Sequence, residues 1–425
     1  MREKLQSTIA IGKSICIIAL AVLAIYQVSQ LWFVNLTNRN FFLYLEARFP
    51  PAVPDGQRAW AQPYRIIYGA GNSVFNIRYS RIANSYAWAY GENALDAILR
   101  NGSFVGSSAI DNARLQSRPV LIYEYAFPMN AETFAMALGR RNGAALTSQG
   151  ITSFYSIAIQ PPTATDSLLR VFFMDATSAW EFTLTPGTRR HPVEDFEFPM
   201  PHISTTEKHF VAVGNSFAPR APDGFLYWPL EARNPHLTVY GGLHMSSIRP
   251  QIEVFFNNPA TINQFVGVDD IYTFTSHNAM VRYLPHDVLE YTSHRTIGRA
   301  ASDNLLSDFS AALAFIYDDQ NVINETFLMG YDDSGREHVF WFGYVSDNFP
   351  LFLTEAWSTG PNCREPLVAP IEVVVDHGRV IRYRRLAFNF RQGSMSWFNP
   401  EVLDEPFILG FPISREGVIE LEIFN

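Results

Sequence analysis

Hydrophobic positions along most of this chain recur with the two-residue period of β-strands, and short turns rich in glycine, asparagine or aspartate separate them. Residues that favour turns stand before and after each of these segments, so they mark where each strand begins and ends. The expected strands are residues 64–68, 74–77, 119–127, 151–159, 168–174, 179–184, 252–256, 270–275, 279–283, 288–292, 326–331, 337–344, 371–375, 379–386 and 418–423.

Four segments have the spacing of helices instead. Residues 92–100 end at an Asn-Gly stop, Asn130 can cap a helix over residues 131–140, and Asn258 opens a short helix that runs to Phe265. Ser302 caps the strongest helix, whose apolar stripe consists of Leu305, Phe309, Leu313 and Ile316. Strands outnumber helices, so we predict an α+β fold of mainly antiparallel sheets with helices on one face.

Two blocks of the chain share the order strand, helix, strand, strand, strand. They span residues 119–184 and 252–292, and they suggest a weak internal repeat of topology rather than of residues. Proline-rich segments at 186–205 and 218–236 lie between the blocks and favour domain boundaries there.

These boundaries predict two or three modules. The expected divisions are an N-terminal domain over residues 38–189, a middle domain over 190–295 and a C-terminal domain over 296–425. Within the first, residues 38–60 combine a short apolar segment with several prolines, which predicts an extended link.

One stretch differs from all others, because residues 14–34 carry no charge. A helix of this length, at about 1.5 Å per residue, matches a hydrocarbon core of roughly 30 Å. The alternative is a cleaved signal peptide, but the apolar run continues into Trp32 and Phe33 without the small residues of a cleavage site. We therefore expect a single uncleaved transmembrane helix.

The charges that flank this helix predict its orientation. Arg2, Lys4 and Lys13 precede it, which places residues 1–13 in the cytoplasm as a short tail and the bulk of the chain outside the cell membrane. An extracytoplasmic location argues against a soluble kinase or an NAD enzyme, because ATP is absent there.

Polar and aromatic side chains within this helix are candidates for contact with a partner helix. Four of them lie toward its outer end: Tyr26, Gln27, Gln30 and Trp32. Polar side chains in lipid find partners at helix interfaces, whereas amphipathic rings favour the headgroup layer. The alternative is that Ser29 and Gln30 already lie in the headgroup region.

Composition excludes several classes of function. The chain is 48% hydrophobic and 14% aromatic, which is sufficient for a packed core in every part. A net charge of -9 and a pI near 5.6 argue against a nucleic-acid partner. Cys16 lies in the apolar stretch and Cys363 far downstream, so we expect no disulfide between them.

Candidate chemistry is sparse. The ten histidines form no HExxH or HxH pattern, and His286 and Glu290 lie too far apart along a strand for a shared metal. The acidic pairs at 269–270, 318–319 and 332–333 fall at turns, where aspartate caps the backbone. Cys363 lies beside Arg364 but has no base near it in sequence. The Phe-Trp-Phe run at 340–342 is typical of core packing. We therefore expect no catalytic residues, no cofactor and no metal.

The second half of the chain resembles the YycH family, the membrane-anchored regulators of the essential cell-wall two-component kinase of low-GC Gram-positive bacteria. The similar segments are IEVFFNNPATINQF, IYTFTSHNAMVRYLPHDVLEYT, LLSDFSAALAFIYD, FLMGYDDSGREHVFWFGYVSDNFPLFL and IEVVVDHGRVIRYRRL, roughly residues 250–390. One segment differs, since Thr275-Ser276-His277 stands where the family has a Thr-Asp-Gly turn.

The resemblance implies a single-pass protein without enzyme activity. Its partners would be a sensor histidine kinase of the YycG or WalK type and a YycI-like sister protein, which it would contact through the membrane and outside it. Two other classes of function stay open. A cell-envelope hydrolase or ligand-binding protein would show a pocket with convergent acids, and an assembly factor would show exposed strand edges.

Overall fold

The structure of the chain is a computed structural model. It describes residues 56–71, 74–79, 85–110, 114–115, 117–139, 144–163, 165–185, 210–212, 227–229, 232–240, 248–256, 258–267, 271–284, 288–293, 304–319, 322, 325–346, 349–353, 366–387, 389–398 and 411–413. The chain divides after Pro54 into two units, and every described residue belongs to the second, Asp55–Asn425. None of the helices described here is long and apolar enough to cross a membrane.

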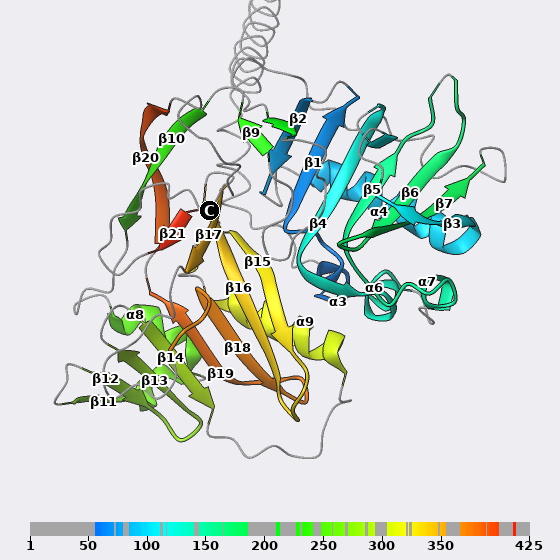
Figure 1. Cartoon of the computed structure of the whole chain (residues 1–425). Helices are drawn as coiled ribbons and strands as arrows, with labels where there is room; N and C mark the ends of the chain where they lie inside the picture. Colours follow the sequence, from blue (N-terminus) through cyan, green and yellow to red (C-terminus); the bar gives the residue numbers. More distant parts are fainter. Residues whose placement is uncertain are drawn as a thin grey trace, which may run out of the picture. The chain divides into compact units, whose positions relative to one another are not determined.

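The first sheet contains nine described strands, all paired antiparallel, in the order β3-β7-β6-β5-β4-β1-β2-β8-β9 (Figure 1). Their bounds are β1 (Arg65–Ala70), β2 (Val74–Arg78), β3 (Ser103–Ala109), β4 (Pro119–Asn130), β5 (Ser153–Gln160), β6 (Leu169–Met174), β7 (Ser178–Leu184), β8 (Phe210–Ala212) and β9 (Tyr227–Pro229). Strands β4 to β7 are buried along most of their length, so this sheet has a core on each face.

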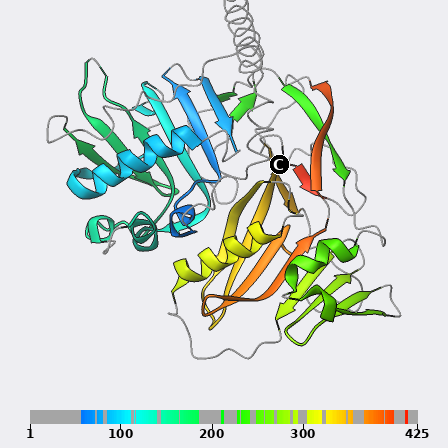
Figure 2. The ribbon, with the colours of Figure 1, turned by 180° about the vertical axis from the view of Figure 1, so that it is seen from behind.

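Short and long helices cover one face of the first sheet. They are α3 (Gly56–Trp60), α4 (Ser85–Asn101), α6 (Ala131–Ala137) and α7 (Ala144–Thr147), and α4 lies across the strands in Figure 2. Helix α4 approaches β4 closely because Gly91 has no side chain: a Cβ there would lie 1.9 Å from the Tyr123 hydroxyl oxygen. That hydroxyl donates to the carbonyl of Ala87, 2.7 Å away, and so fixes α4 on the sheet.

The second sheet has ten described strands, in the order β11-β12-β13-β14-β19-β18-β16-β17-β21, with β15 also paired to β16. Only β17 and β21 pair in parallel among the described strands. The bounds are β11 (Asn263–Val266), β12 (Tyr272–Thr275), β13 (Ala279–Leu284), β14 (Val288–Ser293), β15 (Glu325–Asp332), β16 (His338–Ser346), β17 (Phe349–Leu353), β18 (Ile371–Asp376), β19 (Arg379–Leu386) and β21 (Phe411–Ile413). Helix α9 (Leu305–Asp318) crosses one face, as Figure 2 shows.

The described chain also contains a separate antiparallel ribbon and several short helices. The ribbon joins β10 (Ala232–Tyr240) to β20 (Asn389–Phe398), and the helices are α8 (Ile248–Ile252) and the 3-10 turns η2 (Glu253–Phe255) and η3 (Pro259–Thr261). The predicted α+β class with mainly antiparallel sheets is confirmed, and so are both predicted hairpins of the second sheet, β15–β16 and β18–β19. The predicted division into domains stays a prediction.

Several predicted elements are wrong in type or extent. Residues 252–256 form the end of α8 and the turn η2 rather than a strand, because Ile248, Ile252 and Phe256 are buried at the four-residue spacing of a helix. The segment from Asn258 is a single 3-10 turn followed by β11, not a helix to Phe265. The predicted topology repeat therefore fails in its second block.

The remaining predictions concern helix ends, the start of the chain and its last strand. Helix α4 begins at Ser85, ahead of the predicted 92. The cap of α9 is Asn304, whose side chain accepts from the Leu306 N–H at 3.0 Å, and Ser302 lies outside the described residues. Residues 56–60 form α3 and not an extended link. The predicted last strand, 418–423, and the apolar stretch 14–34 lie outside the described residues, so the transmembrane helix stays a prediction.

Candidate functional site

The sequence singles out four residues for partner contact in a membrane, and all four lie outside the described residues: Tyr26, Gln27, Gln30 and Trp32. The same holds for Cys363 and His286, the candidates for thiol and metal chemistry. Across the described ranges, no group of three or more His, Cys, Asp or Glu side chains is placed to hold a metal ion. The largest group of aromatic contacts between the two sheets instead involves α3, the helix that follows Pro54.

Trp60, the last residue of α3, lies among aromatic side chains from four other elements. Its ring centroid lies 5.0 Å from that of Phe309 on α9 and 4.9 Å from that of Tyr331 on β15. Phe127 of β4, at 6.0 Å, and Phe340 of β16, at 6.4 Å, complete the group. All four contacts are edge-to-face, the arrangement that brings a positive ring edge to a negative ring face. We call these five residues the Trp60 cluster.

Trp60 is only 1% exposed, and its Nε1 has no hydrogen-bond partner among the described residues. Burial of so large a side chain stabilises the fold by roughly 1.5–3 kcal/mol or more, whereas an unpaired buried N–H costs about 1–3 kcal/mol. Ring packing, and not a hydrogen bond of its indole, therefore holds Trp60 in place.

Helix α3 contacts both the first sheet and α9. The hydroxyl of Tyr125 on β4 donates to the carbonyl of Ala61, 2.9 Å away, directly after Trp60. On the opposite side, a Cβ at Gly56 would lie 2.6 Å from the Cβ of Ser310 on α9, so only glycine allows this approach. This short helix thus connects elements of both sheets.

A second contact between the sheets lies on the other face of the first sheet. The ring of Tyr64 lies 5.6 Å from that of Phe327 on β15, and Phe327 and Val345 belong to the core on that face. Phe327 itself fits against Gly343 of β16, where a Cβ would lie 2.5 Å from its ring. Strand β15 therefore packs its side chains into the cores on both faces of the first sheet.

The N-terminal turn of α9 is tied to the second sheet through a buried carboxylate. Asp308 is 1% exposed, and its Oδ2 lies 2.6 Å from Nδ1 of His338 on β16. Its Oδ1 accepts from the N–H of Gly378, 2.5 Å away, in the turn between β18 and β19. His377 and Gly378 both have positive φ, 52° and 76°, as a tight two-residue hairpin requires.

The C-terminal end of α9 is tied to the same sheet by a second buried acid. Oδ2 of Asp319 accepts from Nε of Arg385 at 2.6 Å and from the hydroxyl of Tyr383 at 3.1 Å. Both Arg385 and Asp319 are almost fully buried. Burial and the neighbouring Asp319 raise the pKa of Tyr383 well above its ordinary value, so this hydroxyl stays a donor.

A third buried pair lies within the first sheet. Nε of Arg65 on β1 donates to the carboxylate of Glu124 on β4, and its Nη1 donates to the hydroxyl of Tyr79, 3.0 Å away. Burial alone would lower the pKa of Arg65, but Glu124, Tyr64 and Tyr79 together raise it well above its usual value. The pair is therefore ionised, and its partners satisfy it within the fold.

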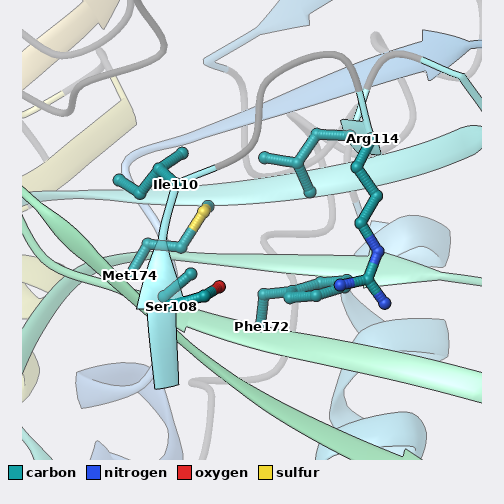
Figure 3. A pocket seen from close by; sticks show the side chains of 7 residues that line it. Ser108, Ile110, Arg114, Phe172 and Met174 are labelled. Carbon is teal, nitrogen blue, oxygen red and sulfur yellow. The ribbon is translucent and has the colours of Figure 1, made fainter. Parts of the chain in front are cut away.

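A small hollow lies at the end of β3, on the face of the first sheet that carries Tyr64 (Figure 3). The Arg114 guanidinium covers the Phe172 ring, 5.2 Å from its centroid, and pairs with Glu181 at 2.8 Å. Ser108, Ile110 and Met174 lie around it. Its volume of about 10 Å³ is enough for about one water molecule, so it is not a site for a substrate.

The acid–histidine contacts do not form a catalytic group in the part of the chain described here. Asp308 with His338, and Asp376 with His377, have the geometry that orients an imidazole as a base. Neither histidine has a serine, threonine or cysteine partner among the described hydrogen bonds. The first contact fixes the start of α9 to β16, whereas Asp376 and His377 are sequence neighbours at the turn between β18 and β19.

Four described strands end the two sheets, namely β3, β9, β11 and β21, and two of them have large exposed apolar side chains. They are β3, which pairs only with β7, and β11, which pairs only with β12. Neither contains a charged residue or proline, the usual protection of an edge. Phe104 and Val105 of β3 are 37% and 58% exposed, and Phe265 and Val266 of β11 are 57% and 59% exposed.

The Trp60 cluster was not predicted from the sequence, because Trp60 follows a proline-rich stretch that is typical of a link. The available signal was the apolar run Ala59-Trp60-Ala61 between Pro54 and Pro63. The three buried acids Asp308, Asp319 and Glu124 bind side chains far away in the chain, such as Arg65 with Glu124, and no local pattern reveals such a contact. The expectation that the Phe-Trp-Phe run is core is confirmed for Phe340 and Phe342.

No family model matches the sequence, and no curated protein matches it. Among solved structures, the crystal structure of YycH from Bacillus subtilis is similar, with a TM-score of 0.44 and 11% sequence identity. The similarity covers 80% of this chain and 84% of that chain. YycH is the family that the sequence of residues 250–390 resembles.

Proposed function

We propose that this chain is a non-enzymatic, membrane-anchored regulator of a two-component sensor histidine kinase that controls cell-wall metabolism. The observation that supports this proposal is where the family-like segments lie. All five belong to one structural group: α9, the end of α8 with its 3-10 turns, and the second sheet from β11 to β19. The resemblance therefore follows the second sheet and its helices rather than scattered segments.

The proposal includes a contact within the membrane. Gln27 and Gln30 are three residues apart, so on a helix they lie about 60° from each other and can face one partner. Each interhelical hydrogen bond in a membrane contributes roughly 0.6 kcal/mol on average, and up to about 2 kcal/mol. Two such bonds amount to about 1–3 kcal/mol, which shifts a kinase equilibrium several-fold.

The test replaces both glutamines by leucine in the full chain. Leucine keeps the helix inserted and removes both hydrogen-bonding groups, so we expect weaker co-purification with the kinase and altered target transcription. The matched control replaces Val22 and Ile25, which have the same spacing, by leucine. If the variant of Gln27 and Gln30 captures and regulates the kinase like the control, the contact lies elsewhere and the proposal of a membrane contact is wrong.

The orientation is part of the same proposal. The positive residues before the apolar stretch support a cytoplasmic N-terminus and an extracytoplasmic bulk. A protease added outside protoplasts should therefore digest the chain beyond residue 38 and spare the first residues. Protection of the C-terminal part, with digestion of residues 1–13, would contradict the orientation.

A second candidate function is assembly of an envelope complex. The observation that favours it is the pair of uncharged, exposed strand edges, β3 and β11, since such edges pair readily with another strand. Lysine at Val105 or at Val266 would place a charge on one edge without touching the core. Loss of a captured complex with either variant, while kinase output stays normal, would favour assembly over regulation.

A further inference from the structure

We propose that β3 pairs with β3 of a second copy of this chain, antiparallel and centred on Ser107, so that the first sheets of two copies join at their edges. The proposal names a partner for one of the two edges on which the assembly function rests, and it requires no kinase. Four observations support it: the length of this edge, the aromatic row that ends there, its lack of charge and the faces on which its side chains lie.

Among the four strands that end the described sheets, β3 is the least protected against further pairing. It has seven residues, and all of its described pairing is with β7. Strands β9 and β21 have three residues each and contain a proline, and β11 has four residues. Short length, proline and charge are the usual means by which an end strand avoids pairing. Because β3 has none of them, the backbone groups that point away from β7 form a long template for another strand.

A row of aromatic rings on one face of the first sheet ends at this edge. Phe173 of β6 has its ring centroid 5.2 Å from that of Phe154 on β5 and 5.7 Å from that of Phe182 on β7. The ring centroid of Phe182 in turn lies 5.3 Å from that of Phe104 on β3. The first three rings are buried, whereas Phe104 is 37% exposed. A further strand on this edge would cover the exposed side of Phe104, as neighbouring strands do inside a sheet.

The composition of β3 suits a copy of itself. Its sequence, SFVGSSA, has no charge that would oppose a like charge across a two-fold axis, and none that would select a charged foreign strand. Most of its side chains are small, so two such strands can approach closely on both faces. All described pairs of the first sheet are antiparallel, which is also the arrangement that a two-fold axis normal to a sheet gives two identical edge strands.

The faces of the side chains define the register. Residues 106–109 pair regularly with β7, so their side chains alternate between the two faces, whereas a register shift between Phe104 and Gly106 interrupts the alternation. A two-fold axis normal to the sheet keeps each face, so residues opposite each other must lie on the same face. Centring the pair on Ser107 meets this condition and brings Ala109 of the copy toward the exposed ring of Phe104. Ser107 then lies opposite Ser107 of the copy.

Disulfide trapping in the full chain tests this register. Ser107→Cys and the matched control Ser103→Cys are introduced singly into a chain with serine at Cys16 and Cys363, and each variant is purified in detergent and oxidised. Residues opposite each other on antiparallel strands have Cβ atoms about 4.5–5.5 Å apart, close to the separation that a disulfide needs. Ser103 lies four residues from the centre, so its side chains in the two copies would be about 25 Å apart.

The expected dimer is weak, because a single short edge buries little area, but oxidation collects even a weak dimer covalently. At equal protein concentration, Ser107→Cys should give at least about tenfold more disulfide-linked dimer than Ser103→Cys. Equal yields at the two positions would show random collision or association through another surface and would overturn the proposal. The absence of a disulfide-linked dimer with Ser107→Cys would overturn it as well.

Charge variants test the pairing without a covalent bond. Ser107 is exposed, so Ser107→Lys and Ser107→Glu leave the core intact. Each variant alone places like charges opposite each other and should lose capture of one tagged copy by another, whereas a mixture of the two variants places opposite charges there and should restore it. Val266→Lys on β11 is the control and should keep capture. A mixture that fails to restore capture, or a control that loses it, would overturn the proposal. Neither readout involves kinase output or an envelope complex, so failure of the proposed function is seen separately.

Discussion

Single buried residues decide how rigidly this fold holds its helices. Asp319 is the clearest case, because one carboxylate accepts from both Arg385 and Tyr383 in a region closed to water. Taking two charges out of water costs several kcal/mol for each, and only close pairing restores it. Such a pair contributes little net free energy to folding. Its effect is that the end of α9 can take only one position against β19.

The first prediction breaks this pair. Asp319→Asn leaves Arg385 charged and without its carboxylate, so we expect the free energy of unfolding to fall by about 3–5 kcal/mol. Arg385→Met in the same chain removes the stranded charge and should restore part of the loss. Denaturant unfolding of both variants measures the difference, and two losses that simply add would contradict the pairing.

Asp166 offers a prediction about pH. Arg118 donates to its carboxylate at 2.6 Å, and the Leu168 N–H and Arg170 donate as well, so the pKa of Asp166 lies well below its ordinary 3.8. The folded chain therefore favours the ionised form. This stabilisation is complete above the ordinary pKa and is lost as the pH falls toward the lowered value.

The measurement compares the native chain with Asp166→Asn, which cannot ionise. The difference in their free energies of unfolding should be constant above about pH 5 and should shrink as the pH falls below about 4. Asp175→Asn is the matched control, because Asp175 sits in an exposed turn of the same sheet and bonds only to backbone and hydroxyl groups in the described chain. A difference for Asp166 that does not depend on pH would contradict the assignment.

At the scale of elements, the caps and turns set where helices and strands begin. Asn304 accepts from the Leu306 N–H at 3.0 Å, and Asn130 accepts from the Thr133 N–H at the same distance. Helix α9 carries three of the fixed contacts described above, so its cap matters more than that of the short α6. We expect Asn304→Ala to lower the free energy of unfolding by about 1 kcal/mol and Asn304→Asp to keep it, as measured by denaturant unfolding.

Elements defined by local chemistry could be predicted from the sequence. The Asn130 cap and the turn at residues 376–378 use side chains and φ angles that neighbouring residues supply, and both are confirmed. The prediction of a strand at 252–256 was wrong because a short run of β-branched and aromatic residues occurs in buried strands and in buried helices alike. Only the burial of Ile248 and Phe256, which depends on the rest of the fold, decides between the two.

The Trp60 cluster could not be predicted for the same reason. Its members come from α3, β4, α9, β15 and β16, which are brought together only when both sheets have formed. A single tryptophan in a proline-rich stretch carries no sign of such partners. Contacts of this kind require the topology of the whole chain, whereas capping and hairpin turns do not.

At the scale of the whole molecule, one hydrophobic core includes residues of both sheets. Trp60 and Phe127 join the core of the first sheet to Phe309 and Phe340 of the second without a break. Domains that share a continuous core lose stability together, whereas domains joined by a small polar interface unfold separately. The two sheets should therefore unfold in one cooperative transition.

Calorimetry of the full chain in nanodiscs measures this directly. We expect one heat-absorption peak whose calorimetric and van't Hoff enthalpies agree. Trp60→Ala removes the side chain that touches elements of both sheets, so it should split the peak in two. Phe173→Ala is the matched control, because this buried ring lies wholly within the first sheet, and it should lower the midpoint without uncoupling the second sheet. Two peaks in the native chain would show that the shared core does not couple the sheets, and the role assigned to Trp60 would then be wrong.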